Sequence, residues 1–431
     1  MDSIREGDEV TSKFLHKACD VVEFKLCRTV ADIDKAKPFK PDYAVNVLGE
    51  DKNELIFGYS DLKIELFFTA SKLNQYYRKT YTEAIPKTLD GIEPDNVEEA
   101  FIKQEILQQE NGAQSIEHFA DLIRQDKKFK PFGRKLHELN VVYNTLQDSS
   151  TRHYEIYFCN TQCPGFREWY QRLETFVLWY VDGGIYIDLD DEQWEFFICY
   201  ERFKDEESGE PRWAPAGFST VFKYITFQKN KITSRLYRPR ISQMLVLPPF
   251  QRQGIGAELL RQIRRFYTRN DVWELTAEDP NEDFQRTRDF VDVEFLMEQE
   301  EFRGPKVKYY TKHRSAFVQA ARQLGKMCEG QSRRCFEILL LNLIPRSNEG
   351  LITSYRLMIK ARLNSAFKKK VQIKRAAILP DSKVPMDHSP VISDDERKQK
   401  LQTDFEAIFA MYDLVLERLN RCRMPKVKLA A

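Results

Sequence analysis

The order of apolar and polar residues along the chain predicts β-strands over much of its first three quarters. In 62–68, apolar and polar residues alternate with the period of two that is typical of a strand. Comparable patterns predict further strands at 55–59, 154–158, 194–200, 216–228, 241–247 and 272–277. The charged segment 204–212 is expected to be a hairpin loop. Within the first 29 residues, a short helix and an extended edge both fit the pattern.

Apolar residues at intervals of three and four predict helices in other parts of the chain. The expected helices lie within 94–128, 165–180, the residues after Gly254, 312–327, 334–342, 354–370 and 394–420. Ser115 is a suitable N-cap for the second helix of 94–128. A domain boundary is expected near 133–150, and a linker rich in Pro, Asp and Ser is expected near 380–393.

The composition is that of an ordinary globular protein. The 431 residues are 42% hydrophobic and 31% charged, which is enough for two or three domains with a sizeable core. The formal net charge is +1, so no global field attracts nucleic acid, and no direct nucleic-acid partner is expected. No run of about 18 apolar residues is present, so no membrane span is expected.

Cysteine and histidine usage points away from metals and disulfides. The eight cysteines form no CxxC pair and the six histidines are scattered, so we expect no metal site and free thiols in a reducing compartment. The polar, acidic first ten residues predict neither a secretory signal nor a mitochondrial transit peptide. The expected location is the cytoplasm, the nucleus or both.

The most informative stretch is 241–260, in which an apolar strand is followed by Pro248-Pro249, a glycine loop and the start of a helix. Amides at a helix N-terminus, together with the helix dipole, favour a phosphorylated ligand. A P-loop requires Gly-Lys-Ser/Thr, but Ala257 follows Gly256, and a dinucleotide fingerprint requires a third glycine where Leu259 stands. Taken alone, the loop fits an ordinary strand-to-helix turn better than a ligand site.

The residues around this loop resemble the acetyl-CoA signature of GCN5-related N-acetyltransferases, and more narrowly the type B histone acetyltransferase catalytic subunits. The resemblance extends from about residue 40 to past 340. The segments that carry it are Arg238–Leu245, Pro249–Ala257, Leu275–Pro280, Lys130–Gly133, Gly165–Glu168 and Asp188–Trp194. It implies an α/β (α+β) acetyltransferase fold with a substrate-binding domain in 1–140, an acetyltransferase core in 141–305 and a helical C-terminal extension in 306–431.

The resemblance also implies where acetyl-CoA binds. The strands Gln243–Leu247 and Trp273–Ala277 are expected to splay apart around the pantetheine arm, and an N–H there can polarise the thioester carbonyl. Backbone groups expected to pair with the arm belong to Met244, Leu245 and Val246. The expected pyrophosphate contacts are Gln251, Arg252, Gln253, Gly254, Ile255, Gly256 and Ala257, and Asn281 and Phe284 are expected near the arm or its thiol end.

The chemistry requires a base, because a lysine with a free pKa of about 10.4 must lose a proton before it attacks. A carboxylate near the thioester, with its pKa raised by burial, can accept that proton. A lone Glu is usually a solvated strand end, but the family resemblance favours Glu278 as the base. Asp279 and Asp182 are further candidates, and direct transfer without a covalent enzyme intermediate is the simplest mechanism.

The resemblance further implies a basic substrate, the N-terminal tail of newly made histone H4. The matching positions are the turn Glu50, Asp51 and Lys52, the aromatic strand Phe222, Lys223 and Tyr224, and the wall residue Trp194. For each position alone, a solvated turn, a cross-strand aromatic pair and a core tryptophan are equally good interpretations.

The family works with a WD-repeat histone-binding subunit, in cytoplasm and nucleus. The lysines at 368–370 fit a solvated helix face somewhat better than a nuclear address. Two alternatives stay open: acetylation of another protein or a small amine, and a non-catalytic histone-binding scaffold. Intact Gly254, Gly256 and Glu278 argue against the scaffold.

Overall fold

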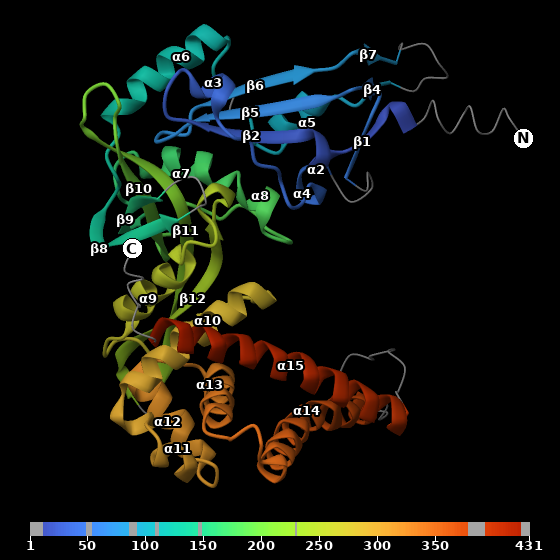
Figure 1. Ribbon diagram of the computed structural model, residues 1–431, viewed down its shortest axis with the longest axis vertical. Helices are drawn as coiled ribbons and strands as arrows, with labels where there is room; N and C mark the ends of the chain where they lie inside the picture. The colour runs from blue at the N-terminus through green and yellow to red at the C-terminus, as the bar shows by residue number, and fades with distance from the viewer. Residues whose placement is uncertain are drawn as a thin grey trace, which may run out of the picture. The chain divides into compact units, whose positions relative to one another are not determined.

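The computed structural model describes residues 12–48, 54–85, 93–107, 112–144, 149–228, 231–377 and 393–423. Contacts divide the chain into two compact units, Met1–Phe227 with Tyr237–Arg265, and Gln228–Leu236 with Phe266–Ala431. The first unit mixes helices and strands, and the second is largely helical (Figure 1). The mixed α/β class is therefore confirmed. The three domains expected from the sequence, with boundaries near 140 and 305, remain a prediction.

A three-stranded sheet in the order β2-β5-β6 organises the N-terminal part of the first unit (Figure 1). β2 is parallel to β5, and β5 is antiparallel to β6. The strands of this part are β1 (Leu15–Lys17), β2 (Val22–Cys27), β3 (Leu55–Phe57), β4 (Tyr59–Ser60), β5 (Lys63–Thr69), β6 (Gln75–Thr80) and β7 (Glu83–Ala84). Its helices are α2 (Ala18–Val21), α3 (Asp32–Lys35), α4 (Val45–Leu48), α5 (Val97–Lys103), α6 (Ile116–Gln125) and the 3-10 turn η2 (Asp126–Lys128).

The predicted strand at 62–68 is β5, and it is buried on both faces. Glu65 is only 3% exposed, and its carboxylate lies 3.1 Å from the Lys25 ammonium and 2.7 Å from the Arg78 guanidinium. A charged side chain is tolerated at this depth because it has three cationic partners, the third being Lys63 at 3.2 Å. The alternation therefore predicted the strand correctly, but its polar positions do not form an exposed face.

Other predictions for this part had mixed outcomes. The first 29 residues contain both a short helix and strands, and Ser115 caps α6 by accepting a 3.2 Å hydrogen bond from the His118 amide. The predicted strand at 55–59 is interrupted at Gly58, which has a φ of +104°. Strand β6 was not predicted. The turn expected at 49–53 and nearly all of the linker expected at 380–393 lie outside the described residues.

The central sheet contains five long strands, which lie in the order β12-β11-β10-β9-β8. They are β8 (Arg134–Asn144), β9 (Ser149–Asn160), β10 (Trp194–Lys204), β11 (Pro211–Gln228) and β12 (Lys231–Val246). The hairpin between β10 and β11 confirms the loop predicted around 204–212. Strand β8 was missed, and Ser149–Ser150, expected in a loop, begin β9. Because β8 has one neighbour and carries polar residues, its pattern of apolar residues is weak.

Aromatic rings pack helix α7 against this sheet. The amphipathic segment predicted at 165–180 forms α7 (Phe166–Glu174) and α8 (Val177–Tyr180), and its predicted apolar face is buried. Phe166 and Tyr170 each lie 4.7 Å, centroid to centroid, from Phe196 on β10. These contacts fix the end of α7 beside the sheet. After β12, the 3-10 turn η3 (Pro248–Phe250) leads to helix α9 (Ile255–Tyr267), as the prolines and glycines predicted.

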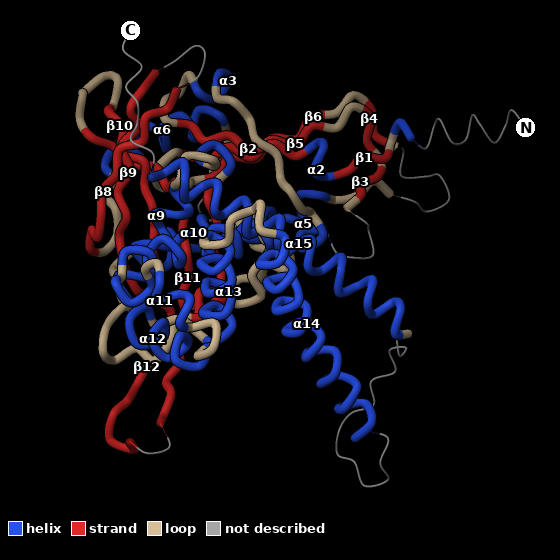
Figure 2. Tube along the Cα trace, turned by 60° about the horizontal axis from the view of Figure 1, so that its bottom comes forward, coloured by secondary structure: helices blue, strands red, loops and turns tan. Residues whose placement is uncertain are grey.

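The second unit is built from helices. They are α10 (Glu282–Glu298), the 3-10 turn η4 (Glu300–Phe302), α11 (Pro305–Tyr309), α12 (Arg314–Gly325), α13 (Glu329–Asn342), α14 (Glu349–Ala377) and α15 (Asp394–Arg423), after the two-residue strand β13 (Thr276–Ala277). Figure 2 shows the length of α14 and α15, which pack on each other. The helices predicted at 312–327, 334–342, 354–370 and 394–420 are confirmed. The strand predicted at 272–277 is wrong in extent, because only its end is regular strand.

Helix α10 was not predicted, because charged residues occur all around it. Asp289 on α10 is fully buried. Its carboxylate accepts hydrogen bonds from Arg334 at 2.6 Å, from Gln285 at 2.8 Å and from Gln331 at 3.0 Å. A buried acid with this set of donors is stable, so α10 packs through polar residues that hide its period. Within the described residues, no helix is long and apolar enough to cross a membrane.

A buried carboxylate also joins parts of the first unit that are far apart in sequence. Asp126 is 1% exposed and accepts hydrogen bonds from the amides of Ser71 at 2.8 Å and Lys72 at 2.6 Å. The Thr69 hydroxyl donates to it at 3.1 Å, and the Arg212 guanidinium lies 3.4 Å away. Asp126 thereby connects the turn after β5 to strand β11 of the central sheet.

Replacing Asp126 should therefore destabilise the first unit strongly. In Asp126→Ala, the buried Arg212 loses an anionic partner and two amides lose their acceptor, so we expect a loss of about 3–5 kcal/mol in unfolding free energy. Asp121→Ala is the control, because the Asp121–Arg124 pair is exposed and is worth about 0–1 kcal/mol. Urea denaturation measures both variants. Equal losses would contradict the role assigned to Asp126.

Candidate functional site

The last residues of β12 alternate in burial. Gln243, Leu245 and Leu247 are buried, while Met244 and Val246 are partly exposed on the other face. A Cβ on Gly217, in the neighbouring strand β11, would lie 2.8 Å from the carbonyl oxygen of Leu245. Glycine is therefore required for the close approach of β11 to the end of β12. The close approach of β11 thus fixes the Met244–Val246 segment, whose Met244 and Val246 side chains stay partly exposed near Gly256 of α9.

The turn after β12 exposes a cluster of backbone amides. Arg252 and Gly254 have left-handed φ angles of +62° and +85°, and the Tyr154 hydroxyl anchors the loop by donating to Gln253 Oε1 at 2.7 Å. Within the described residues, the amides from Arg252 to Ala257 have no protein acceptor. The first hydrogen bond of the helix begins one residue later, from the Glu258 amide to the Gly254 carbonyl at 3.1 Å. Such a cluster at the start of the 13-residue helix α9 suits an anionic group.

The structure brings some of the predicted residues together and leaves others apart. The predicted cofactor residues 244–246 and 251–257 are adjacent in the first unit, at the end of β12 and the start of α9. Asp182 follows α8 in the same unit and is exposed. Glu278, Asp279, Asn281 and Phe284 belong to the second unit. Their approach to the cofactor residues remains a prediction.

In the second unit, Glu278 and Asp279 directly follow β13. Both residues are exposed, so the burial that was expected for Glu278 is not observed. The segment before them is fixed, because the Leu275 amide donates to the Lys326 carbonyl at 2.6 Å. Asp279 has a φ of +26°, an unusual conformation for a residue other than glycine. The acidic pair is therefore displayed on a constrained turn.

Asn281 caps helix α10 in the second unit. Its side-chain oxygen accepts a hydrogen bond from the Phe284 amide at 2.9 Å. This structural role occupies its acceptor and was not predicted. Contacts of Asn281 and Phe284 with the cofactor remain predictions.

The expected substrate strand is aromatic and ordered. Trp194 on β10 pairs with Phe222 on β11 in the sheet register, with ring centroids 4.9 Å apart. Tyr224 is 40% exposed and lies 4.6 Å from Phe222, centroid to centroid. Lys223 forms a 3.0 Å ion pair with Glu195. The cross-strand aromatic pair is thus present, and its contact with substrate remains a prediction.

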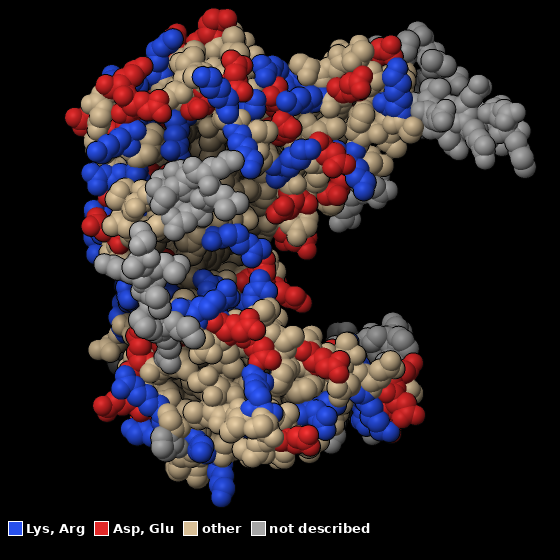
Figure 3. Space-filling model, viewed as in Figure 1, with Lys and Arg blue, Asp and Glu red and all other residues tan. Residues whose placement is uncertain are grey.

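The turn formed by Glu50, Asp51 and Lys52 lies outside the described residues. Charge elsewhere gives no simple indication of a substrate surface, because basic and acidic side chains are interspersed on the face shown in Figure 3. Within the described residues, no three His, Cys, Asp or Glu side chains gather as a metal site.

Glu174 is a buried carboxyl at the end of α7 for which no role was predicted. Glu174 is 3% exposed, and its Oε1 accepts a 2.7 Å hydrogen bond from the Ile187 amide. Desolvation raises its pKa to about 8, the Ile187 amide opposes this shift, and the charge of Glu105 adds to it. One signal was available in the sequence, since Glu174 lies on the apolar side of the helix between Leu173 and Val177.

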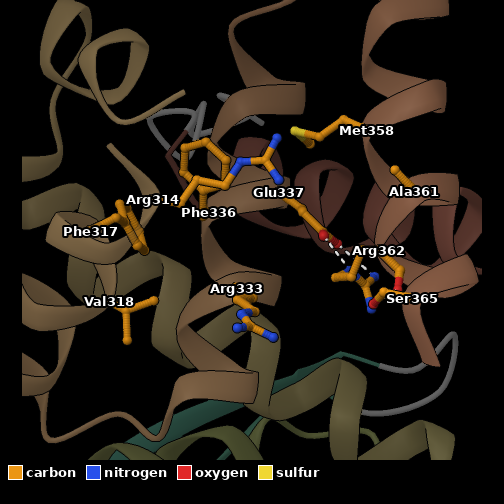
Figure 4. A pocket seen from close by; sticks show the side chains of 10 residues that line it. All are labelled: Arg314, Phe317, Val318, Arg333, Phe336, Glu337, Met358, Ala361, Arg362 and Ser365. Atoms are coloured by element: carbon orange, nitrogen blue, oxygen red, sulfur yellow. Dashed lines mark hydrogen bonds and ion pairs between the residues drawn. The ribbon is translucent and has the colours of Figure 1, made fainter. Parts of the chain in front are cut away.

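A separate cavity of about 340 Å³ lies in the second unit between α12, α13 and α14 (Figure 4). Phe317 and Phe336 form part of its apolar wall. The buried Glu337 carboxylate in its lining is held by Arg362 at 2.6 and 2.9 Å and by the Tyr412 hydroxyl at 2.8 Å. Because its acid is committed to these partners, the cavity does not resemble a reaction site.

Comparisons with known proteins identify the family of the chain. A family model described as "Histone acetyl transferase HAT1 N-terminus" matches residues 14–182, and one described as "Histone acetyltransferase type B catalytic subunit, C-terminal" matches 288–341. The chain is 34% identical to the histone acetyltransferase type B catalytic subunit of Homo sapiens over 403 residues, which cover 92% of each protein. The chain belongs to the family of type B histone acetyltransferase catalytic subunits.

Other type B catalytic subunits are also similar to this chain. The subunit of Rattus norvegicus is 33% identical over 92% of each chain, and that of Cryptococcus neoformans is 29% identical over 82% of this chain and 90% of its own. As a member of this family, the protein is an acetyltransferase with the fold of the GCN5-related N-acetyltransferases. The resemblance recognised in the sequence is confirmed.

The raised pKa of Glu174 predicts a pH dependence of stability. Between pH 4.5 and about 8, the native state keeps the proton that the unfolded chain releases. Unfolding free energy should therefore fall as pH rises through this window, by up to about 1.4 kcal/mol per pH unit. The stabilisation is fully present below pH 4.5 and is lost above about 8.

The variant Glu174→Gln should remove this dependence, because its side chain stays neutral at every pH. Urea denaturation between pH 5 and 8 measures the slopes for wild type and variant. Glu168→Gln is the control, since Glu168 is an exposed residue of the same helix and should keep the wild-type slope. A Glu174→Gln protein with the wild-type slope would contradict the prediction.

Proposed function

We propose that this acetyltransferase transfers acetyl from acetyl-CoA to lysine ε-amines of histones, chiefly in the N-terminal tail of newly synthesised histone H4. The observation that supports it most directly is the amide cluster of 252–257 at the start of α9, next to the partly exposed side chains of Met244 and Val246. Family membership supports the substrate class, because the similar proteins are named as histone acetyltransferases.

The first unit would supply cofactor binding. The amides of 252–257 would donate hydrogen bonds to the pyrophosphate of the cofactor, and Arg252 would add a positive charge on an exposed turn. Backbone groups of Met244, Leu245 and Val246 would pair with the pantetheine arm. Acetyl-CoA supplies the activated acyl group as a thioester. An amide of this strand would polarise the thioester carbonyl as negative charge develops on its oxygen.

The second unit would supply the base. Glu278 accepts a proton from the substrate ammonium, directly or through one water, and the freed amine attacks the thioester carbon. A C–N bond forms, the C–S bond breaks, and CoA leaves as a thiolate that takes up the second proton lost by the attacking nitrogen. The exposed position of Glu278 means that substrate and cofactor would have to exclude water from it. Asp279 and Asp182 would hold the substrate cation or assist the proton transfer.

The substrate peptide would lie against the aromatic strand formed by Trp194, Phe222 and Tyr224, with Lys223 beside it. The proposal also assigns substrate binding to Glu50, Asp51 and Lys52. A WD-repeat histone-binding subunit would deliver the histone, in cytoplasm and nucleus.

A second candidate, acetylation of another protein or of a small amine, would use the same cofactor residues. Mass spectrometry of a mixed histone pool, with free polyamine added, separates the two by the acetylated product.

The variant Glu278→Gln should lose activity while still binding its cofactor. Removing a general base costs about 10²- to 10⁴-fold in turnover, so we expect a fall of that size in kcat. The Kd for acetyl-CoA, measured by calorimetry, should change little. Glu282→Gln is the matched control, because Glu282 is an exposed acid four residues away, in the first turn of α10. Turnover of Glu278→Gln comparable with wild type across pH would refute this role.

A further inference from the structure

One large apolar side chain in the first unit is displayed in an unusual way. Ile185 is 74% exposed, more than any other large hydrophobic residue in the described part of the chain. A single exposed aliphatic residue on a loose loop needs no explanation. Ile185 differs because the backbone on both sides of it is fixed by buried groups. We call residues 184–187 the strap.

The first anchor of the strap comes from the proposed cofactor strand. Gln243 is 6% exposed, directly precedes Met244, and donates from Nε2 to the Ile185 carbonyl at 2.7 Å. Its Oε1 accepts from the Tyr170 hydroxyl at 3.4 Å and from the Thr220 hydroxyl at 3.5 Å. The amide group of Gln243 is therefore held from both ends, which orients its donor at the strap.

The second anchor comes from α7. Oε1 of the buried Glu174 accepts the Ile187 amide at 2.7 Å, so carbonyl and amide groups two residues apart are both bound. The hydroxyl of Tyr186, between them, donates to the Gln104 carbonyl at 2.9 Å. A Cβ on Gly184 would lie 2.8 Å from the Val177 carbonyl oxygen, so only glycine fits at the first residue of the strap.

This arrangement fixes the position of Ile185 before any ligand binds. Little backbone entropy would then be lost when a partner contacts the side chain. Exposed acids flank the strap in sequence, with Asp182 on one side and Asp188 on the other. An apolar side chain between two carboxylates matches a lysine or arginine, whose methylene stem packs on apolar surface while its charge meets an acid.

We propose that Ile185 is a specificity-determining contact for a basic side chain of the substrate peptide, with Gln243 and Glu174 as positioning residues that hold the strap. This inference rests on the proposed function. It adds a contact outside the aromatic strand and the cofactor loop. It also connects peptide binding to the cofactor strand, because the Gln243 backbone belongs to β12 and its side chain holds the strap.

The first test is Ile185→Ser, assayed with a lysine-rich histone tail peptide. Losing the apolar contact should raise the peptide KM about tenfold and leave kcat and the acetyl-CoA Kd within about twofold. Val142→Ser is the control, since Val142 is a 59% exposed aliphatic residue of the same unit. An unchanged peptide KM in Ile185→Ser would overturn the contact.

The second test concerns the anchors. Glu174→Gln keeps an oxygen acceptor for the Ile187 amide and should retain the wild-type peptide KM at neutral pH, whereas Glu174→Leu removes the acceptor and should raise it. Gln243→Met, which cannot donate to the Ile185 carbonyl, should raise it too. Hydrogen exchange of 185–187, followed by mass spectrometry in the full chain, should become faster in Glu174→Leu and Gln243→Met. Unchanged exchange in both would overturn the positioning role.

The proposed function and the role of Ile185 can be refuted separately. If wild-type protein does not acetylate histone peptides, the proposed function fails, and the exchange rates still report whether the anchors hold the strap. If wild type is active and Ile185→Ser retains its peptide KM, the function stands and the specificity role of Ile185 is wrong.

Discussion

A buried polar group must find partners inside the protein, and in this chain that requirement decides which elements lie together. Asp126 needs four donors, and they come from the turn after β5 and from β11. Asp289 needs donors from two helices, and this joins α10 to α13. Apolar packing alone would allow these elements to slide, whereas a buried carboxylate has few acceptable positions. Polar residues in the interior therefore specify the arrangement that aromatic packing stabilises.

The same requirement explains what the sequence revealed and what it did not. Strands such as 62–68 and the amphipathic segment 165–180 followed from apolar period, because their burial depends on side chains that the period displays. Helix α10 was missed because its buried face includes Arg288, Asp289 and Asp292. Their partners come from distant parts of the chain, so no local pattern announces them. Strand β8 was missed for a different reason, since an edge strand needs few apolar residues.

The candidate site shows a comparable division. The glycine loop was found in the sequence because a left-handed backbone favours glycine, as at Gly254. Gly217, which allows β11 to approach the end of β12 closely, was not singled out. Gln243 and Glu174 were given no role, since their importance lies in the distances to Ile185 and Ile187 that only the fold supplies. Burial was expected for Glu278, yet its turn leaves it exposed. The environment of a site residue thus depends on the fold around it, which residue type alone does not reveal.

In the strap, the hydrogen bonds that hold residue 185 in place do not depend on which side chain it carries. The hydrogen bonds from Gln243 and Glu174 are made to backbone groups of residues 185 and 187, so the side chain at 185 contributes nothing to holding the segment. Substitution there would alter what the enzyme offers to a peptide without disturbing the framework that offers it. Substrate preference at this position is therefore free to diverge at little cost in folding, and a library confined to residue 185 would retarget the enzyme more safely than one spread over the aromatic strand.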